Sequence, residues 1–158
     1  MAFSFFGAYS RKMNWQWRAF SELSTDDLYE LIKFREEVFV VEQKCIYLEC
    51  DGWDRKAMHL LGYEDGKLTA YLRAFPAGMR YREMCLGRVA VKNAARGQGA
   101  GRNLVAEGLA QMRKAWGEGP IRISAQTYLL RFYRDFGFVP EGEEYLDDGI
   151  PHRYMVRP

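Results

Sequence analysis

The 158-residue chain lacks the features that mark several specialised classes of protein. No apolar run approaches the roughly 20 residues that a helix needs to cross a bilayer, which argues against a membrane partner. The 23 Lys and Arg side chains nearly balance 21 Asp and Glu, so the basic surplus typical of nucleic-acid-binding proteins is missing. With 48% hydrophobic and 15% aromatic residues, the composition is typical of one soluble globular domain.

Cysteine and histidine are also scarce. The three cysteines, Cys45, Cys50 and Cys85, form no C-x-x-C pair, and only two histidines accompany them. These are too few ligands for zinc, so we expect no metal site, and the odd number of thiols is typical of reduced cysteines in the cytoplasm. Cys85 as a nucleophile would require a thiol and histidine motif that the sequence does not have, which favours a buried structural thiol.

The N-terminal stretch does not match a secretory signal. Its aromatic residues precede Arg11 and Lys12, whereas in a signal peptide the charges come first. We expect residues 1–12 to form a disordered tail and residues 13–158 to form a single domain.

The pattern of apolar residues predicts alternating strands and helices. A strand is expected from Trp15 to Phe20, and Ser24 is suited to cap a helix that runs to about Val38. The other expected elements are hairpin strands at 58–63 and 68–75 joined by an Asp-Gly turn, strands at 85–91 and 121–125, helices from the glycine cluster to near Gly117 and over 129–136, and strand-like pieces around Tyr145 and Tyr154. This order indicates an α/β fold of the α+β type.

A glycine cluster follows the strand at 85–91 and opens the next helix. It has the pattern R-x-x-G-x-G, from Arg96 through Gly99 to Gly101, and matches neither the Walker nor the Rossmann pattern. Glycines at a helix start let backbone N–H groups converge on an anion such as a phosphate. The alternative is a glycine-rich turn without a ligand.

Charge is distributed unevenly along the chain. Residues 80–102 hold six basic side chains and one acid, residues 36–54 hold six acids and one base, and residues 141–148 hold five acids. Together these runs suggest an anionic cofactor at the basic segment and a cationic group near the acidic ones. Each run is also compatible with a solvated face.

Several blocks, taken in order, resemble the GNAT acyltransferases and in particular their ElaA-like branch. They are LGRVAV, R-x-x-G-x-G, REEVFVVEQKC, YLECDGWD, SAQTYLLRFYRDFGF and EEYLDDGIPHRYM. The resemblance extends from Trp15 to Met155 and implies a single-domain GNAT fold. That fold has a central, mixed, mostly antiparallel twisted sheet with a splayed strand pair and about four flanking helices. It also implies acetyl-coenzyme A as co-substrate.

The resemblance implies specific binding roles. Main chain of the 85–91 strand would bind the pantetheine arm, the glycine cluster would bind the pyrophosphate, and Gln126 takes a polar position after the next strand. The implied cofactor-binding residues are Val89, Ala90, Val91, Arg96, Gly97, Gln98, Gly99, Ala100, Gly101, Arg102 and Gln126.

Direct transfer of an acetyl group to an amine needs a base, an oxyanion donor and an acid. Tyr133 matches the family tyrosine near the cofactor sulfur and would protonate the leaving thiolate; the alternative is a packing residue. Glu42 is the first candidate for the base, with Asp51 and Asp54 behind it, and these acids alternatively only attract a cation. The backbone N–H of Val91 would donate a hydrogen bond to the oxyanion.

The expected acceptor is a small-molecule amine or a lysine side chain. Asp51, Asp54, Asp148 and His152 are its candidate binding residues, with His152 either a base or a structural hydrogen-bonding residue. The alternative functions are a non-catalytic sensor of acyl-coenzyme A and a site for another nucleotide. Exposed strand edges near the C-terminus are compatible with a homodimer.

Overall fold

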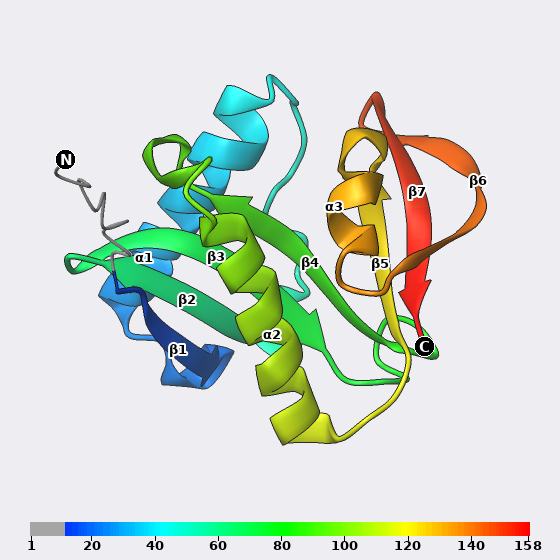
Figure 1. The fold of residues 1–158 in the computed structure, drawn as a ribbon. Coiled ribbons are helices and arrows are strands. Elements are labelled where there is room, and N and C mark those ends of the chain that lie inside the picture. Colours follow the sequence, from blue (N-terminus) through cyan, green and yellow to red (C-terminus); the bar gives the residue numbers. More distant parts are fainter. Residues whose placement is uncertain (1–11) are drawn as a thin grey trace, which may run out of the picture.

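One seven-stranded sheet runs through the computed structural model, which describes residues 12–158 (Figure 1). The tail expected over residues 1–12 therefore lies outside the described residues, apart from Lys12. The sheet order is β1-β2-β3-β4-β5-β7-β6. Its strands are β1 (Asn14–Ala19), β2 (Met58–Glu64), β3 (Lys67–Phe75), β4 (Met84–Val91), β5 (Ile121–Gln126), β6 (Val139–Asp147) and β7 (Ile150–Arg157). Only β4 and β5 pair in parallel, which confirms the mixed, mostly antiparallel sheet.

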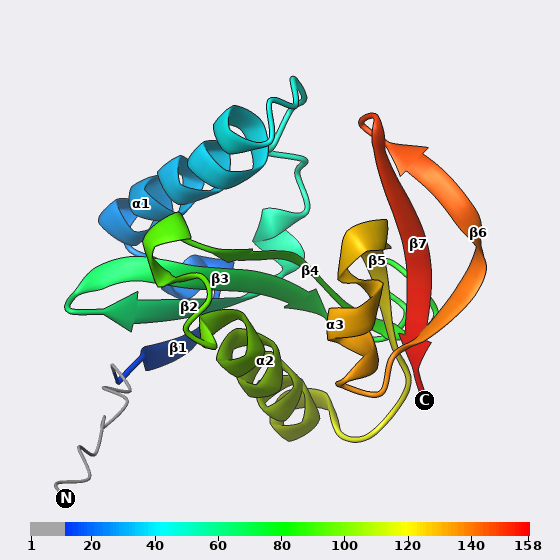
Figure 2. The same ribbon diagram turned by 45° about the horizontal axis from the view of Figure 1, so that its top comes forward.

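Helices cover both faces of the sheet (Figure 2). They are α1 (Thr25–Arg35) on one face and α2 (Ala100–Trp116) and α3 (Leu130–Arg134) on the other. Ser24 caps α1 as expected: its Oγ accepts the N–H of Asp27 at 3.0 Å. The chain then continues as a π-helical segment, Glu36–Glu42, beyond the predicted helix end near Val38. Beside the three α-helices and this π-helical segment, the described residues contain four 3₁₀ turns of three residues each.

The hairpin between β2 and β3 has the predicted turn. Asp65 and Gly66 both have positive φ, 49° and 74°, which is the conformation of a two-residue hairpin loop whose twist matches its strands. The hairpin places two cross-strand pairs of large buried residues on opposite faces of the sheet. Leu60 faces Leu72 on the α2 side of the sheet, and Leu61 faces Tyr71 on the α1 side.

Two apolar cores form because residues alternate between the two faces of β2 and β3. The core under α1 contains Leu31 and Phe34, and the larger core under α2 and α3 contains Leu104 and Met112. Helix α2 approaches β3 closely at Gly108, where a Cβ atom would lie 2.7 Å from a methyl group of Leu72. A glycine is needed there so that the helix can pack on the strand.

The sheet opens between β4 and β5. These strands pair only at Met84 with Ile121 and at Cys85 with Arg122, and beyond these pairs they diverge (Figure 1). Tyr71 of β3 pairs with Ala90 of β4, and Arg73 pairs with Gly87. The single residue Leu72 therefore lies opposite two residues of β4, Arg88 and Val89. One of the two, Arg88, has a φ of 52°, so β4 contains a β-bulge that increases its local twist. The splayed strand pair expected from the resemblance is confirmed.

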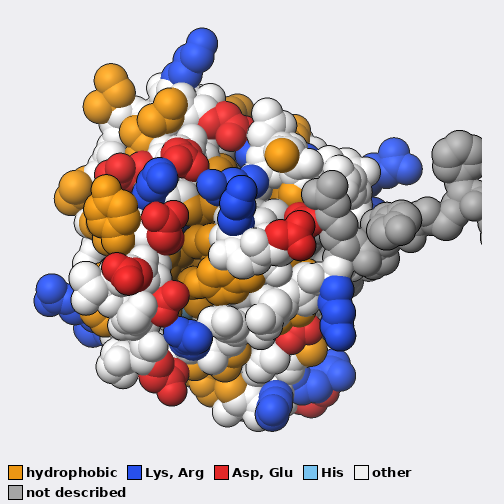
Figure 3. All heavy atoms as spheres, turned by 90° about the vertical axis from the view of Figure 1, so that its left-hand side faces the viewer, with side chains coloured by type: hydrophobic (Ala, Val, Ile, Leu, Met, Phe, Trp, Pro, Cys, Tyr) orange, Lys and Arg blue, Asp and Glu red, His pale blue; other side chains and the backbone are white. Residues whose placement is uncertain are grey.

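The surface of the described residues carries mixed charge. On the face in Figure 3, Lys and Arg side chains are interspersed with Asp and Glu, and hydrophobic side chains are visible between them. Within residues 12–158, no helix has the length and apolar character needed to cross a membrane.

Candidate active site

Two clefts meet where the sheet opens. One, of about 810 Å³, lies beside the glycine loop and is lined by Val91, Gly97, Gly99 and Arg102. The other, of about 570 Å³, lies between β4, β5 and β7 and is lined by residues such as Asp51, Asp148 and His152. We call them the loop cleft and the acceptor cleft. The residues lining both clefts are Phe39, Gln43, Val89, Gln126, Tyr128, Leu129, Tyr133 and Ile150.

The glycine loop presents main chain to the loop cleft. Gly97 and Gly99 have φ of 77° and 82°, and a Cβ atom on either would meet nothing within 4 Å, so a ligand can approach the backbone. Gly99 is the N-cap of the 17-residue α2. The first N–H groups of a helix have no acceptor within it and lie at the positive end of its dipole. The residues present therefore fit a pyrophosphate group.

The edge of β4 adds further main-chain groups. Lys92 N–H donates to Thr69 O at 2.8 Å, so the adjacent pair, Val91 with Ala70, is a non-hydrogen-bonded pair of the antiparallel ladder. Val91 therefore points its N–H and C=O away from β3, and its carbonyl accepts from Arg96 Nε at 2.9 Å. Ala90, which pairs with Tyr71, turns the same groups towards β3, so Val91 is the one of these two neighbours that presents its main chain to the opening.

Tyr133 lies at the junction of the two clefts. Its ring packs against Phe132 and Phe138 with centroids 5.0 and 5.9 Å apart, and the residue is only 6% exposed. Its hydroxyl has no hydrogen-bond partner among the described residues. Burial, and to a lesser extent the neighbouring Tyr128, raise the pKa of Tyr133. The phenol therefore stays protonated at neutral pH and is able to donate.

Glu42 lies at the loop cleft, at the end of the π-helical segment. Both of its carboxylate oxygens contact the guanidinium of Arg96, one of them at 3.1 Å. Because Arg96 also holds the Val91 carbonyl, this ion pair ties the π-helical segment to β4 and the glycine loop. Glu42 is not among the residues that line the acceptor cleft.

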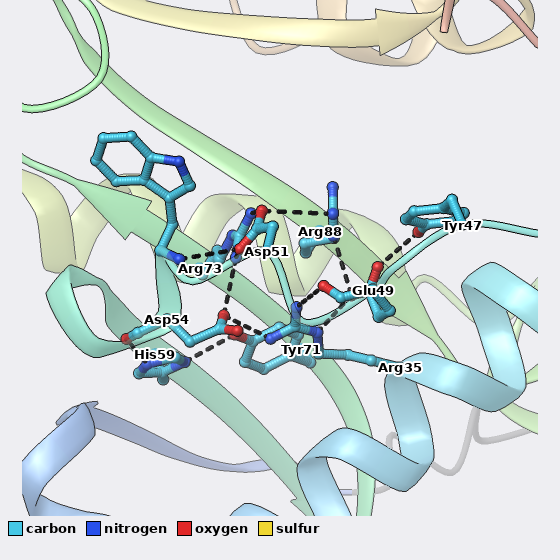
Figure 4. Close-up of polar contacts among 10 residues, drawn as sticks. Arg35, Tyr47, Glu49, Asp51, Asp54, His59, Tyr71, Arg73 and Arg88 are labelled. Atoms are coloured by element: carbon cyan, nitrogen blue, oxygen red, sulfur yellow. Dashed lines mark hydrogen bonds and ion pairs between the residues drawn. The ribbon is translucent and has the colours of Figure 1, made fainter. Parts of the chain in front are cut away.

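Asp51 and Asp54 are held by buried arginines (Figure 4). Arg73 contacts both carboxylates, and Arg35 Nη1 lies 2.6 Å from Asp54 Oδ1. Burial works to raise the pKa of each acid, but the hydrogen bonds and charges of the arginines outweigh it, so both pKa values are lowered. Such carboxylates are weak bases, although Asp51 does line the acceptor cleft.

Glu49 and Arg88 extend this network towards β4 (Figure 4). Glu49 accepts from Arg35 Nε at 2.6 Å, from Arg88 Nε at 3.0 Å and from the Tyr47 hydroxyl at 2.6 Å. Arg88 is the bulge residue of β4, so the network fixes the bulge relative to α1. Sequence reasoning missed Arg35, Glu49, Arg73 and Arg88. Arg35 did carry a signal, because it lies on the apolar face of α1 with Leu31, where a charge requires a buried partner.

His152 is oriented within the acceptor cleft. Its Nδ1 lies 2.7 Å from the carbonyl oxygen of Ile150. A carbonyl oxygen only accepts, so Nδ1 carries the hydrogen and Nε2 of the neutral ring has a free lone pair. The ring stacks on Tyr145 with centroids 6.0 Å apart.

Asp148 and Gln126 each contact the segment that follows the π-helical segment. Asp148 lines the acceptor cleft, and its carbonyl accepts from Cys45 Sγ at 3.9 Å. Gln126 Nε2 donates to Gln43 Oε1 at 3.4 Å. These two contacts connect the segment after the π-helix with β5 and the β6–β7 turn across the opening.

A sheet that opens beside an anion-binding helix start, with a buried phenol at the opening, is the layout of acyltransferases that use an acyl-coenzyme A. The comparisons specify the family: a model described as the acetyltransferase (GNAT) domain matches residues 24–157, and the chain belongs to this family. Protein ElaA of Escherichia coli is 40% identical over 147 residues, which covers 92% of this chain and 96% of that protein.

Solved structures agree with this assignment. A crystal structure described as an acyl-CoA N-acyltransferase from Pseudomonas aeruginosa is 40% identical, with a TM-score of 0.89, and covers 93% of this chain and 100% of that chain. The crystal structure of E. coli ElaA is 38% identical, with a TM-score of 0.87 and the same coverage. The GNAT fold expected from the sequence is thus confirmed.

Proposed function

We propose that the protein is an N-acetyltransferase that transfers the acetyl group of acetyl-coenzyme A directly to an amine. The position of Tyr133 carries the proposal: a buried, protonated phenol lies at the junction between a cleft suited to an anionic cofactor and a cleft suited to a small acceptor. The Pseudomonas relative described as an acyl-CoA N-acyltransferase supports the same activity.

In this mechanism each group has one task. The N–H groups of the glycine loop bind the pyrophosphate, together with Arg102, and main chain of Val89 and Val91 aligns the pantetheine arm. The Val91 N–H is available to the thioester oxygen as negative charge develops on it. Tyr133 donates its proton to the sulfur as the carbon–sulfur bond breaks.

The amine must lose a proton as it attacks, and we assign this step to His152. Its Nε2 lone pair is free in the acceptor cleft, where the amine has to lie. Glu42, the first candidate from the sequence, is paired with Arg96 at the loop cleft, and Asp51 and Asp54 are neutralised by Arg35 and Arg73. The ion pairs argue against all three carboxylates as the base. Asp148 lines the acceptor cleft and would attract the protonated amine.

Titration calorimetry with acetyl-coenzyme A tests the proposal, with ATP and NAD as controls. We expect micromolar binding of acetyl-coenzyme A alone, followed by thiol release when amines are added. Binding without thiol release for any amine would indicate a non-catalytic sensor of acyl-coenzyme A. No binding to the folded protein would refute the proposal.

The location of this activity is also part of the proposal. All three cysteines are free, and Cys50 is exposed. An exposed free thiol is typical of a reducing compartment, which supports action in the cytoplasm.

A further inference from the structure

Arg80 is a cation without an acidic partner in the acceptor cleft. The other arginines lining that cleft are neutralised: Arg73 by Asp51 and Asp54, Arg88 by Glu49 and Asp51, and Arg122 by Glu83 and Glu141. Among residues 12–158, no carboxylate forms an ion pair with Arg80. Its charge is therefore available to a ligand in the cleft.

Three aromatic rings hold the Arg80 guanidinium. Its central carbon lies 5.1 Å from the ring centre of Trp53, 5.4 Å from that of Phe75 and 6.0 Å from that of Tyr81. The loop that carries Arg80 is closed by a hydrogen bond of 2.8 Å from Gly78 N–H to Tyr81 O. Rings that stack on a guanidinium leave the N–H groups at its edge free for a carboxylate or phosphate. Because Arg80 occupies the space between the rings, they are not free to bind a substrate ammonium.

A row of rings leads from Arg80 to His152. Tyr81 contacts Tyr154, Tyr154 stacks on Tyr145, and Tyr145 stacks on His152, with centroids 6.1, 4.9 and 6.0 Å apart. All four rings line the acceptor cleft. They offer an apolar wall to the stem of an acceptor that extends along β5.

The length of this wall limits the acceptor. At the Arg80 end, Arg122 lies over both Tyr81 and Tyr154. At the other end, Gln126 pairs with His152. Arg122 and Gln126 are four positions apart on β5, which corresponds to about 13 Å of strand. An acceptor that reaches from the Arg80 end of the wall to the His152 end therefore needs a stem of several methylene groups.

We propose that the acceptor is a primary amine with an anionic group at the far end of an apolar stem, and that Arg80 binds this anion. The inference rests on the proposed acetyltransferase activity and narrows it. A lysine within a protein chain has no carboxylate of its own, because its α-carboxyl group is in a peptide bond, whereas an ω-amino carboxylate has one. The acceptor is accordingly a small molecule, which the volume of about 570 Å³ accommodates.

Three amines with the same stem test this proposal: 6-aminohexanoate, 6-aminohexyl phosphate and hexylamine. We expect kcat/KM of the unmodified protein to be at least tenfold higher for one of the two anionic amines than for hexylamine. A preference for 6-aminohexanoate would indicate that Arg80 binds a carboxylate, and a preference for 6-aminohexyl phosphate would indicate a phosphate. Arg80→Gln should reduce that preference to less than twofold, mainly through KM, and Arg80→Lys should retain part of it. Arg113→Gln, at an exposed arginine of α2, is the matched control.

Direct binding separates failure of this inference from failure of the acetyltransferase proposal. Titration of the two anionic amines into the unmodified protein and Arg80→Gln requires no turnover, and we expect at least tenfold weaker binding to the variant. Equal binding to both proteins, no binding to the unmodified protein, or equal kcat/KM for all three amines would overturn the role of Arg80. Absence of acetyl-coenzyme A binding would instead refute the acetyltransferase proposal.

Discussion

His152 donates its Nδ1 hydrogen to the carbonyl oxygen of Ile150 over 2.7 Å. This bond determines the tautomer, so Nε2 is an acceptor in the same cleft that Tyr133 lines. The proposed mechanism needs a base that accepts a proton from the amine and an acid that donates one to the thiolate. His152 can accept a proton, and Tyr133 can donate one. His152 has a free lone pair, and Tyr133 has a phenol that burial keeps protonated.

His152→Gln tests the base. We expect kcat to fall about 100-fold, the low end of what general base catalysis contributes. The Kd for acetyl-coenzyme A should change less than about twofold, because His152 lines the acceptor cleft and not the loop cleft. Thiol release at saturating amine measures kcat, and titration calorimetry measures the Kd. Tyr145→Phe keeps the ring that stacks on His152 and should keep kcat within about twofold of the parent value. If His152→Gln kept a kcat close to that of Tyr145→Phe, another group would be the base.

Tyr133→Phe tests the acid. The variant keeps the buried ring and lacks only the hydroxyl, so we expect kcat to fall about 100-fold while the Kd for acetyl-coenzyme A changes less than twofold. Since the pKa of Tyr133 is raised, the phenol stays protonated up to at least about pH 10, and its ionisation should not lower the rate below that pH. Tyr128→Phe, at an exposed tyrosine lining both clefts, is the control. Equal losses in the two variants would contradict the assignment.

Glu42→Gln separates a structural from a catalytic role. The Arg96 ion pair is half exposed, so it contributes up to about 1 kcal/mol, and we expect the KM for acetyl-coenzyme A to rise by less than about fivefold. The kcat at saturation and the pH profile should not change. Glu37→Gln breaks a similarly exposed pair with Lys92 and is the control. A 100-fold loss of kcat confined to Glu42→Gln would restore this residue as the base.

The periodic parts of the fold could be predicted from the sequence because their signals are local. The Asp65–Gly66 turn, the Ser24 cap and the start of α2 after Gly99 each depend on residues within one turn of chain. The glycine loop was predictable for the same reason, since one short segment supplies all of its backbone donors.

The buried ion network could not be predicted in this way. Arg35 and Glu49 are 14 residues apart, and Asp51 meets Arg73 across 22 residues. The acids of this segment look like a solvated face in the sequence, and only the fold shows that arginines from α1 and β3 neutralise them. The sequence favours Glu42 as a base for the same reason, because nothing in it indicates the ion pair with Arg96.

Gly99→Ala tests the glycine loop against the glycine at the other end of α2. A Cβ atom on Gly99 or Gly117 meets nothing within 4 Å, so neither substitution causes a clash. Gly99 is left-handed helical, with φ 82° and ψ 0°, and alanine there should cost about 1 kcal/mol of stability. Gly117 has φ 83° and ψ −170°, a conformation that essentially only glycine adopts, so Gly117→Ala should lower the Tm more. Only Gly99→Ala should weaken acetyl-coenzyme A binding, by about tenfold in calorimetry. Equal affinities in the two variants would contradict a pyrophosphate site at this loop.

The stability of the protein should depend on pH through Asp51 and Asp54. Both carboxyl groups have lowered pKa values in the fold, against about 3.9 in an unfolded chain. An acid with a lowered pKa stabilises the fold above its unfolded pKa and loses this contribution as the pH falls towards the folded value. We therefore expect the contribution of these two acids to the free energy of unfolding to be constant from pH 7 to about 5 and to decrease below about pH 4.

Asp54→Asn identifies the contribution of this acid. The variant leaves Arg35 and Arg73 with one carboxylate fewer in a buried site, so we expect a loss of about 3 kcal/mol at pH 7 in urea unfolding. As the pH falls below about 4, the Asp54 carboxyl takes up a proton more readily in the unfolded chain than in the fold, so the difference between parent and variant should shrink towards pH 3. Asp26→Asn, at an exposed position in the first turn of α1, should change stability by less than about 1 kcal/mol at any pH. A difference between parent and Asp54→Asn that stays constant from pH 7 to pH 3 would mean that the charge of Asp54 does not stabilise the fold, because removing a proton-sensitive ion pair must leave a pH-dependent gap.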